Sequence, residues 1–204
     1  MIRRLARLEK GQSFLIHGAA GGVGSAALEL ARVFGLRAFG TASAAKHDLV
    51  RSLGGIPLAR QPDEWAEELE RIAPQGVDAA FDSYGADSFK RSWRALSPRG
   101  SLVCYGMSPS IDGGTADFLK GLSYITSRKL FGGKRRTLIC SAPAIVGDDP
   151  EWFRVSMTKI LGWAEDGSLQ PVLAGVFPWT EMAEAHRQLA NGKLKGKLLL
   201  DFSL

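Results

Sequence analysis

The chain has 204 residues, and 26 lysines and arginines against 21 aspartates and glutamates give it a formal net charge of +5. With 45% hydrophobic and 23% charged residues, the composition excludes intrinsic disorder as the main state. No run approaches the ~20 apolar residues of a membrane span, and the basic N-terminus lacks the apolar run of a signal peptide. Cys104 and Cys140 are too few for a disulfide framework, which predicts a reducing, cytoplasmic setting. Together with three scattered histidines, they also predict no structural metal site.

Apolar segments alternate with amphipathic segments over the first half of the chain, and glycines fall between them. The alternation predicts a parallel sheet covered by helices on both faces, that is, a Rossmann-type doubly wound α/β fold. The expected strands are residues 13–16, 37–40, 56–58, 77–81 and 101–105. The first helix is expected to turn inward a stripe of Val23, Ala26, Ala27, Leu30, Ala31 and Phe34. Later helices are expected over 46–53, 63–72 and the segment around Phe89 and Trp93.

The regular alternation stops after Gly106. Residues 107–116 predict a loop, followed by a helix over 117–128 and a strand over 137–140. Asp149 and Pro150 predict the N-cap and first turn of a helix that continues to about residue 165. Its expected inward face holds Phe153, Met157, Ile160, Leu161 and Ala164. The C-terminal tail predicts a strand over 172–176, a helix over 180–191 and a strand over 197–200.

A glycine-rich turn, His-Gly-Ala-Ala-Gly-Gly-Val-Gly over residues 17–24, joins the first strand to the first helix. Free amides and the dipole at a helix start attract anions, and Gly21 and Gly22 let a pyrophosphate approach the backbone. Gly24 lets the helix pack close to the sheet. This is a Rossmann dinucleotide fingerprint with Ala19 at the first glycine position. Because the run follows a strand and opens an amphipathic helix, it favours a dinucleotide site over a purely structural turn. The predicted contacts are Ala20, Gly21, Gly22 and Val23.

The end of the second strand distinguishes NAD from NADP. NAD-binding proteins usually carry a carboxylate there for the ribose 2′-hydroxyl, but this chain has no acidic residue between Thr41 and Lys46. Ser43 can donate a hydrogen bond to a 2′-phosphate, Lys46 supplies positive charge, and Arg60 after the third strand adds a second cation. The turn therefore predicts NADP(H). The alternative is that Lys46 is simply an exposed helix residue.

Two further segments follow the fourth and fifth strands. Ligands of doubly wound sheets lie outside the carboxyl ends of the strands. Ser83 and Tyr84 follow one strand, and Tyr105 and Gly106 end the other. These residues are expected to border the ribose and nicotinamide, although both tyrosines could instead pack against a neighbouring loop.

In this order, the motifs resemble the cofactor-binding half of the medium-chain dehydrogenase/reductase superfamily. The nearest resemblance is to its zinc-independent quinone oxidoreductase branch, which includes zeta-crystallin-like proteins. The resemblance covers nearly the whole chain. It is carried by residues 17–24, the Lys46 turn, Gly76-Val77-Asp78, Asp82-Ser83-Tyr84-Gly85, residues 96–100 and residues 192–200.

The resemblance implies hydride transfer from NADPH to a quinone or enone, with a GroES-like catalytic domain preceding the nucleotide domain. That domain is expected to be missing here, so the chain alone is expected to be inactive or weakly active. Residues 9–166 would form the NADP-binding domain, and 167–204 a tail that packs on the missing domain. The family also implies a homodimer through the edge strand 137–140 and places Lys197 near the pyrophosphate.

No residue is predicted to be catalytic, and His17, His47 and His186 are interpreted as structural or exposed. A short-chain dehydrogenase would need a Tyr-x-x-x-Lys pair, which the chain lacks. A non-catalytic NADPH-binding module stays open as an alternative. A basic cluster over residues 128–136 raises nucleic-acid binding, but it lacks interleaved aromatic residues apart from Phe131. Neither a nucleic-acid nor a membrane partner is expected.

Overall fold

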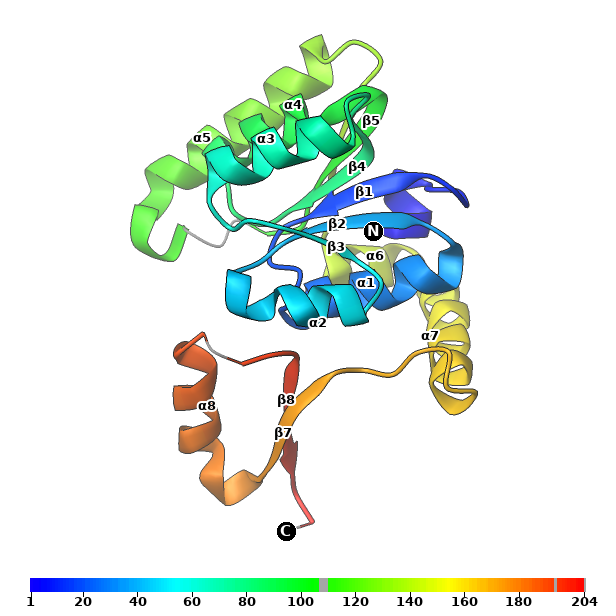
Figure 1. The fold of residues 1–204 in the computed structure, drawn as a ribbon, viewed down its shortest axis with the longest axis vertical. Coiled ribbons are helices and arrows are strands. Elements are labelled where there is room, and N and C mark those ends of the chain that lie inside the picture. The colour runs from blue at the N-terminus through cyan, green and yellow to red at the C-terminus, as the bar shows by residue number, and fades with distance from the viewer. Residues whose placement is uncertain (107–109, 193, 204) are drawn as a thin grey trace.

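The computed structural model describes residues 1–106, 110–192 and 194–203 of the chain. Within these residues a parallel sheet of six strands lies between two layers of helices (Figure 1). Its order is β3-β2-β1-β4-β5-β6, formed by β1 (Ser13–Ile16), β2 (Arg37–Thr41), β3 (Ile56–Leu58), β4 (Val77–Asp82), β5 (Leu96–Cys104) and β6 (Arg136–Ile139). This is the order of doubly wound dinucleotide-binding sheets, so the predicted Rossmann-type fold is confirmed.

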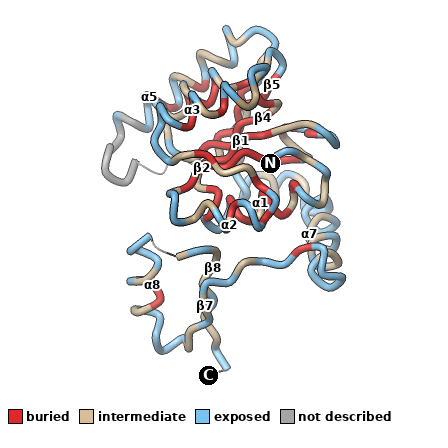
Figure 2. The backbone as a smooth tube through the Cα atoms, viewed as in Figure 1, coloured by how far each residue is buried: buried red, intermediate tan, exposed pale blue. Residues whose placement is uncertain are grey.

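The two faces of the sheet bury separate hydrophobic cores, because successive side chains of a strand point to opposite sides. In β1, Phe14 and Ile16 enter one core while Leu15 enters the other. Helices α1 (Gly22–Phe34) and α2 (His47–Ser52) cover the first face, and α3 (Pro62–Ile72), α4 (Ala86–Arg94) and α5 (Ser110–Phe131) cover the second. Figure 2 shows the buried residues concentrated along the central strands.

The predicted stripe of α1 is confirmed in part, because Ala27 and Ala31 are buried and Leu30 and Phe34 pack against the core. Gly24, Ala27, Leu28 and Ala31 are buried, whereas Val23 is 48% exposed. The backbone of the glycine turn packs against Gly24, and this close approach fixes which side of the helix turns inward. The buried face therefore includes Gly24 and Leu28, which the stripe lacked, and Val23 lies on the solvent side of the first turn.

The second half of the chain differs most from the expected elements. Residues 110–116, predicted as loop, belong to the 22-residue helix α5, and 107–109 lie outside the described residues. Once the following residues are helical, further residues add to the same helix without a new nucleation step. Strand β6 begins and ends one residue before the predicted 137–140 strand. Strand β5 begins at Leu96, five residues before the predicted strand.

Helices α6 (Ala142–Asp148) and α7 (Pro150–Glu165) follow β6. The predicted cap of α7 is confirmed, since Asp149 accepts a hydrogen bond of 3.0 Å from the Trp152 amide. The predicted inward face is wrong, because Phe153, Met157 and Leu161 are exposed. The sheet is already covered by other helices, so α7 lies at the margin of the domain, where Trp163 packs on Phe34 of α1.

The C-terminal tail forms β7 (Leu173–Pro178), α8 (Met182–Ala190) and β8 (Lys197–Asp201). β7 and β8 pair in parallel as a separate two-stranded sheet beside the main domain (Figure 1). Most residues of the tail are exposed or half-buried (Figure 2). In the ranges that the structure describes, every helix is too short or too polar to cross a lipid bilayer.

Candidate functional site

The turn between β1 and α1 presents backbone amides to solvent. Gly18 adopts a positive φ of 66°, and its carbonyl accepts a hydrogen bond of 2.9 Å from the Gly21 amide. Gly21 is the N-cap of α1 and has no side chain to satisfy the first amides of the helix. A Cβ on Gly22 would meet open space, so a ligand can approach the backbone there. This cradle fits an anionic group at the helix start.

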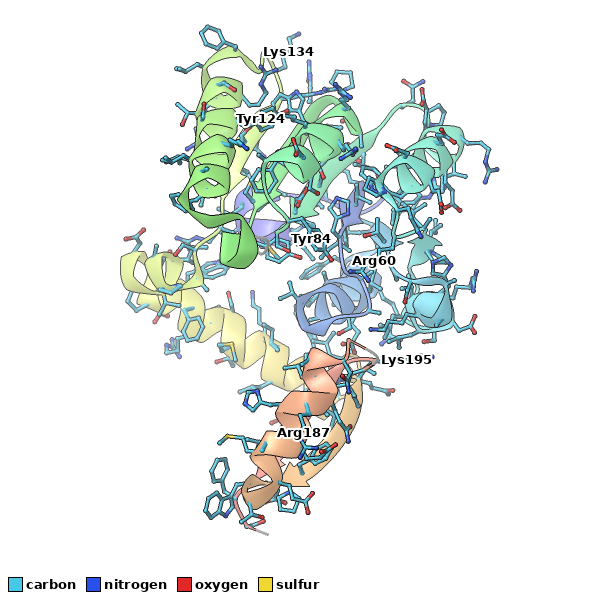
Figure 3. The ribbon with its side chains drawn as sticks, turned by 90° about the vertical axis from the view of Figure 1, so that its left-hand side faces the viewer. Arg60, Tyr84, Tyr124, Lys134, Arg187 and Lys195 are labelled. Atoms are coloured by element: carbon cyan, nitrogen blue, oxygen red, sulfur yellow. The ribbon has the colours of Figure 1, made fainter. Side chains whose placement is uncertain are left out.

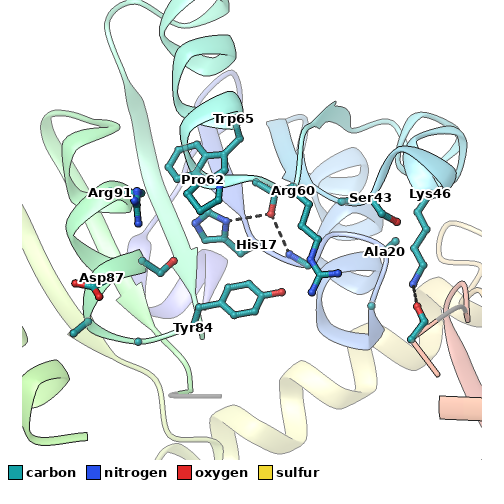
Figure 4. Close-up of a pocket in the computed structure, with 18 of the residues that line it drawn as sticks. His17, Ala20, Ser43, Lys46, Arg60, Pro62, Trp65, Tyr84, Asp87 and Arg91 are labelled. Carbon is teal, nitrogen blue, oxygen red and sulfur yellow. Dashed lines mark hydrogen bonds between the residues drawn. The ribbon is translucent and has the colours of Figure 1, made fainter. Parts of the chain in front are cut away.

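A cavity of about 650 Å³ lies beside this turn, at the carboxyl ends of β1, β2, β3 and β4. In Figure 4, Arg60 and Tyr84 point into it from opposite sides. Its wall contains Gly18, Ala20 and Gly21 from the glycine turn and Thr41 to Ser43 from the turn after β2. The order of the strands thus brings together turns that are up to about 70 residues apart in sequence.

The charge of the lining residues is predominantly positive. Among the lining residues that the structure describes, Asp87 is acidic, and Lys46, Arg60, Arg91 and Lys120 are basic. Asp87 is already paired with Lys90 at 2.9 Å. Within the described part of the chain, Arg60 makes no hydrogen bond or ion pair, which leaves its guanidinium available to a ligand. The cavity therefore suits an anion.

The C-terminal tail reaches the glycine turn. The Gly196 amide donates a hydrogen bond of 3.3 Å to the Ala20 carbonyl, and Lys197 Nζ lies 3.3 Å from Ser25 Oγ. Lys197 thus brings positive charge to the first turns of α1, near the predicted pyrophosphate position. Lys46 Nζ also contacts the tail, through the Gly192 carbonyl (Figure 4).

Buried polar side chains lie beneath the cavity. His17 Nδ1 is 3.1 Å from Thr41 Oγ1, and His17 Nε2 is 2.9 Å from Ser92 Oγ. Ser92 donates to Asp82 at 2.6 Å, and Ser88 donates to the same carboxylate at 2.7 Å. Burial lowers the pKa of His17, and the Asp82 charge opposes this only in part, so the imidazole is neutral near pH 7. His17 therefore acts here as a neutral hydrogen-bonding residue.

The predicted site residues fall into three groups. The cavity brings together Ala20, Gly21, Thr41, Ser43, Lys46, Arg60 and Tyr84. Gly22 and Val23 are exposed on the first turn of α1, next to the cavity but outside its lining, and Lys197 from the tail contacts Ser25 in the same turn. Ser83, Tyr105 and Gly106 lie at the ends of β4 and β5, beyond Tyr84, and are not part of the cavity wall.

Several residues that line the cavity are not among the site residues predicted from the sequence. Ser88 and Arg91 belong to α4, which begins directly after the turn at Tyr84, and this position beside the sheet edge could have indicated them. Trp65 of α3 packs its ring against His17, with centroids 5.1 Å apart. Lys120 and Gly192 come from distant segments, and no local pattern identifies them.

The basic cluster over residues 128–136 makes most of its contacts within the fold. Arg135 donates to the carbonyls of Trp93 and Ser97 at 3.0 Å each and to that of Leu96. Arg136 donates to Ser101 Oγ. Arg135 directly precedes β6 and Arg136 begins it, so both lie at the edge of the sheet away from the cavity. Figure 3 shows Lys134 far from Arg60 and Tyr84.

Comparison with known proteins finds a matching family and relatives that cover most of the chain. A family described as zinc-binding dehydrogenase matches residues 58–200. The synaptic vesicle membrane protein VAT-1 homolog of Rattus norvegicus is 32% identical over 201 residues, which are 95% of this chain and 50% of that protein. This chain thus spans about half the length of the VAT-1 homologs that it matches.

Solved structures share the fold over nearly the whole chain. The CurK enoyl reductase is 28% identical with a TM-score of 0.76, and the match covers 98% of this chain and 57% of that one. A Pseudomonas syringae quinone oxidoreductase has a TM-score of 0.77 at 19% identity, covering 97% and 59%. A mycobacterial protein in complex with NADPH has a TM-score of 0.75 at 21% identity, covering 97% and 58%. The last two likenesses concern the fold alone.

Zinc would require several Cys, His, Asp or Glu side chains around one point. In the part of the chain that the structure describes, no three such side chains form a group of this kind. Burial, together with the nearby Asp82 charge, raises the pKa of the Cys104 thiol to about 12, which disfavours the thiolate that binds metal. The described residues therefore do not fit a zinc ion.

Proposed function

This chain belongs to the zinc-binding dehydrogenase family of the medium-chain dehydrogenase/reductase superfamily, as a quinone oxidoreductase-like cofactor-binding half, and on this premise we propose that it binds NADPH. Joined to a catalytic domain, it would serve hydride transfer to a quinone or enone acceptor. In this proposal residues 9–166 form the nucleotide domain and 167–204 the tail that packs on the catalytic domain. The free cysteines favour a cytoplasmic setting.

The observation that carries the proposal is the chemistry at the end of β2. The turn from Thr41 to Lys46 contains no carboxylate that would repel a 2′-phosphate. Ser43, Lys46 and Arg60 instead border one cavity, where a hydroxyl and two cations can hold a phosphate dianion. The same cavity adjoins the amide cradle of the glycine turn, which suits the pyrophosphate.

When bound, NADPH would supply the hydride, and the protein would bind and orient it. The amides at Gly22 and Val23 would hold the pyrophosphate, with Lys197 adding charge. Tyr84 and Tyr105 would border the ribose and nicotinamide. Burial raises the pKa of Tyr105, so its phenol stays protonated. The hydroxyl donates a hydrogen bond of 3.5 Å to the His17 carbonyl. Ser83 and Gly106 would complete this border.

We also propose a homodimer formed through the edge of β6. This strand ends the sheet, and Ile139 on it is 50% exposed. An unpaired strand edge readily pairs with the same edge of a second copy. Sedimentation or size-exclusion measurements on the chain would show a dimer, and a Thr137→Pro variant, which removes a strand amide, would show a monomer.

The experiment that tests the cofactor proposal is a parallel titration of the chain with NADPH and NADH, followed by nicotinamide fluorescence. We expect at least tenfold tighter binding of NADPH, since a charge-assisted phosphate contact contributes about 1.5–3 kcal/mol. Equal affinities would contradict the proposal.

The alternative is a non-catalytic NADPH-binding module. Steady-state reduction of a quinone by the chain separates the two readings. NADPH binding without turnover supports the module for the chain alone, whereas turnover at ordinary enzyme rates excludes it.

A further inference from the structure

A continuous line of buried hydrogen bonds crosses the sheet beneath the cavity. It runs from Thr41 at the end of β2, through His17 after β1, to Ser92 in α4 and Asp82 at the end of β4. His17 is only 4% exposed, and Ser92 and Asp82 are completely buried. The four side chains thus connect three strands and one helix at the edge where the cavity lies.

The direction of these bonds follows from the number of protons available. Three donors converge on the Asp82 carboxylate: the Tyr84 amide at 2.8 Å and the hydroxyls of Ser88 and Ser92. Because the Ser92 hydroxyl donates its single proton to Asp82, its oxygen accepts a hydrogen bond from His17 Nε2. The neutral imidazole then accepts at Nδ1 from the Thr41 hydroxyl.

Each end of the line reaches a backbone turn that borders the cavity. At one end Thr41 Oγ1 accepts a hydrogen bond of 3.3 Å from the Gly18 amide, at the start of the glycine turn. At the other end Asp82 holds the Tyr84 amide. The two turns come close together, since a Cβ built on Gly18 would lie 3.5 Å from the Tyr84 hydroxyl oxygen.

We propose that His17 and Ser92 are positioning residues that hold the glycine turn and the turn at Tyr84 in register for the cofactor. The inference rests on the proposed NADPH binding by this cavity. Neither side chain needs to touch a reacting atom. Their role is to keep Gly18 and Tyr84 at a fixed separation, because loss of either link leaves buried polar atoms without partners and lets the turns move.

The test compares Ser92→Ala with Ser101→Ala. Ser101 is also a buried serine, but it bonds Arg136 at the opposite side of the fold, so its loss costs a buried hydrogen bond without touching the line. Two readouts are amide hydrogen exchange at Gly18 without cofactor and the Kd for NADPH. We expect Ser92→Ala to speed exchange at Gly18 at least tenfold and to raise the Kd about tenfold. Ser101→Ala should leave both within twofold.

A second pair of variants distinguishes loss of the hydrogen bond to Ser92 from a general loss of stability. In His17→Gln the side-chain amide can still donate to Ser92, whereas His17→Phe fills the space without a hydrogen bond. We expect the Gln variant to keep the Kd within threefold and the Phe variant to raise it at least tenfold. Equal behaviour of Ser92→Ala and Ser101→Ala in both readouts would overturn the inference. Failure of the wild-type chain to bind NADPH would instead refute the proposed function, and the exchange experiment would still decide the positioning role.

Discussion

Lys46 Nζ donates a hydrogen bond of 2.7 Å to the carbonyl oxygen of Gly192. This contact links the turn after β2 to the turn after α8, 146 residues later. Both residues line the cavity beside the glycine turn. A neutral carbonyl is a weaker partner for an ammonium group than a phosphate dianion, so a bound 2′-phosphate can take the place of Gly192.

Replacement of Lys46 by alanine should therefore weaken NADPH binding selectively. We expect a rise of about tenfold in the Kd for NADPH, because one charge-assisted contact is lost at a partly exposed site. The Kd for NADH should stay within twofold, since NADH has no 2′-phosphate. Fluorescence titration measures both constants. Arg51→Ala is the control, because it removes an exposed positive charge in the neighbouring helix without touching the cavity. A parallel loss for both cofactors would contradict this role of Lys46.

Two glycines of the turn should respond in opposite ways to alanine. At Gly24 an added Cβ would collide with the backbone of Gly18 and Ala19, so Gly24→Ala should lower the free energy of unfolding by about 1–3 kcal/mol. At Gly22 the Cβ meets open space, so Gly22→Ala should keep or raise stability. Its methyl group would nevertheless stand where a pyrophosphate approaches, and the Kd for NADPH should rise at least tenfold. Urea unfolding and titration check both variants, and unchanged binding by Gly22→Ala would refute the cradle.

The stability of the protein should fall in mild acid because of His17. Burial keeps the pKa of this imidazole below its ordinary value of 6.5 in the folded chain. Below pH 6.5 the unfolded chain binds a proton that the folded chain does not, so the free energy of unfolding decreases as the pH falls toward the folded pKa. One proton accounts for at most about 1.4 kcal/mol per pH unit. Above pH 6.5 the contribution is complete.

Unfolding experiments between pH 7 and pH 5 on the wild type and on His17→Gln isolate this contribution. The groups facing His17 are Asp82, Tyr84 and Tyr105, and they are unchanged in the variant. We expect a shallower pH dependence for His17→Gln. Identical slopes would show that His17 is protonated equally in both states.

Arg135 should stabilise the fold rather than bind a polyanion. Its guanidinium donates to three backbone carbonyls and lies over the Trp93 ring at 5.7 Å. We expect Arg135→Ala to lower the free energy of unfolding by about 2 kcal/mol, because these carbonyls lose a charged donor. Lys134→Ala removes an adjacent exposed charge and should change stability by less than about 0.5 kcal/mol. Equal effects of the two substitutions in urea unfolding would contradict this assignment.

Local chemistry made much of the fold predictable from the sequence. The glycine-rich turn, the alternation of apolar strands with amphipathic helices and the Asp149 cap are signals contained within a few residues. Each acts through backbone geometry that neighbouring residues decide, and the predictions of the sheet type and the cap are confirmed, although β5 begins earlier than expected. The residue types of the Lys46 turn likewise predict an anionic ligand from a few neighbouring residues.

Tertiary structure alone decided which faces are covered and which distant groups meet. Periodicity marks an apolar stripe on α7 but not whether another element covers it, and Phe153 and Leu161 remain exposed. A run of basic residues does not indicate that Arg135 donates hydrogen bonds to three backbone carbonyls. The hydrogen bonds of His17 with Thr41 and Ser92 join segments about 25 and 75 residues apart. The contact of Lys46 with Gly192 in the tail spans 146 residues. The sequence determines such contacts only through the packing of the whole sheet, because hydrogen bonding and burial depend on distance in space and not on distance along the chain.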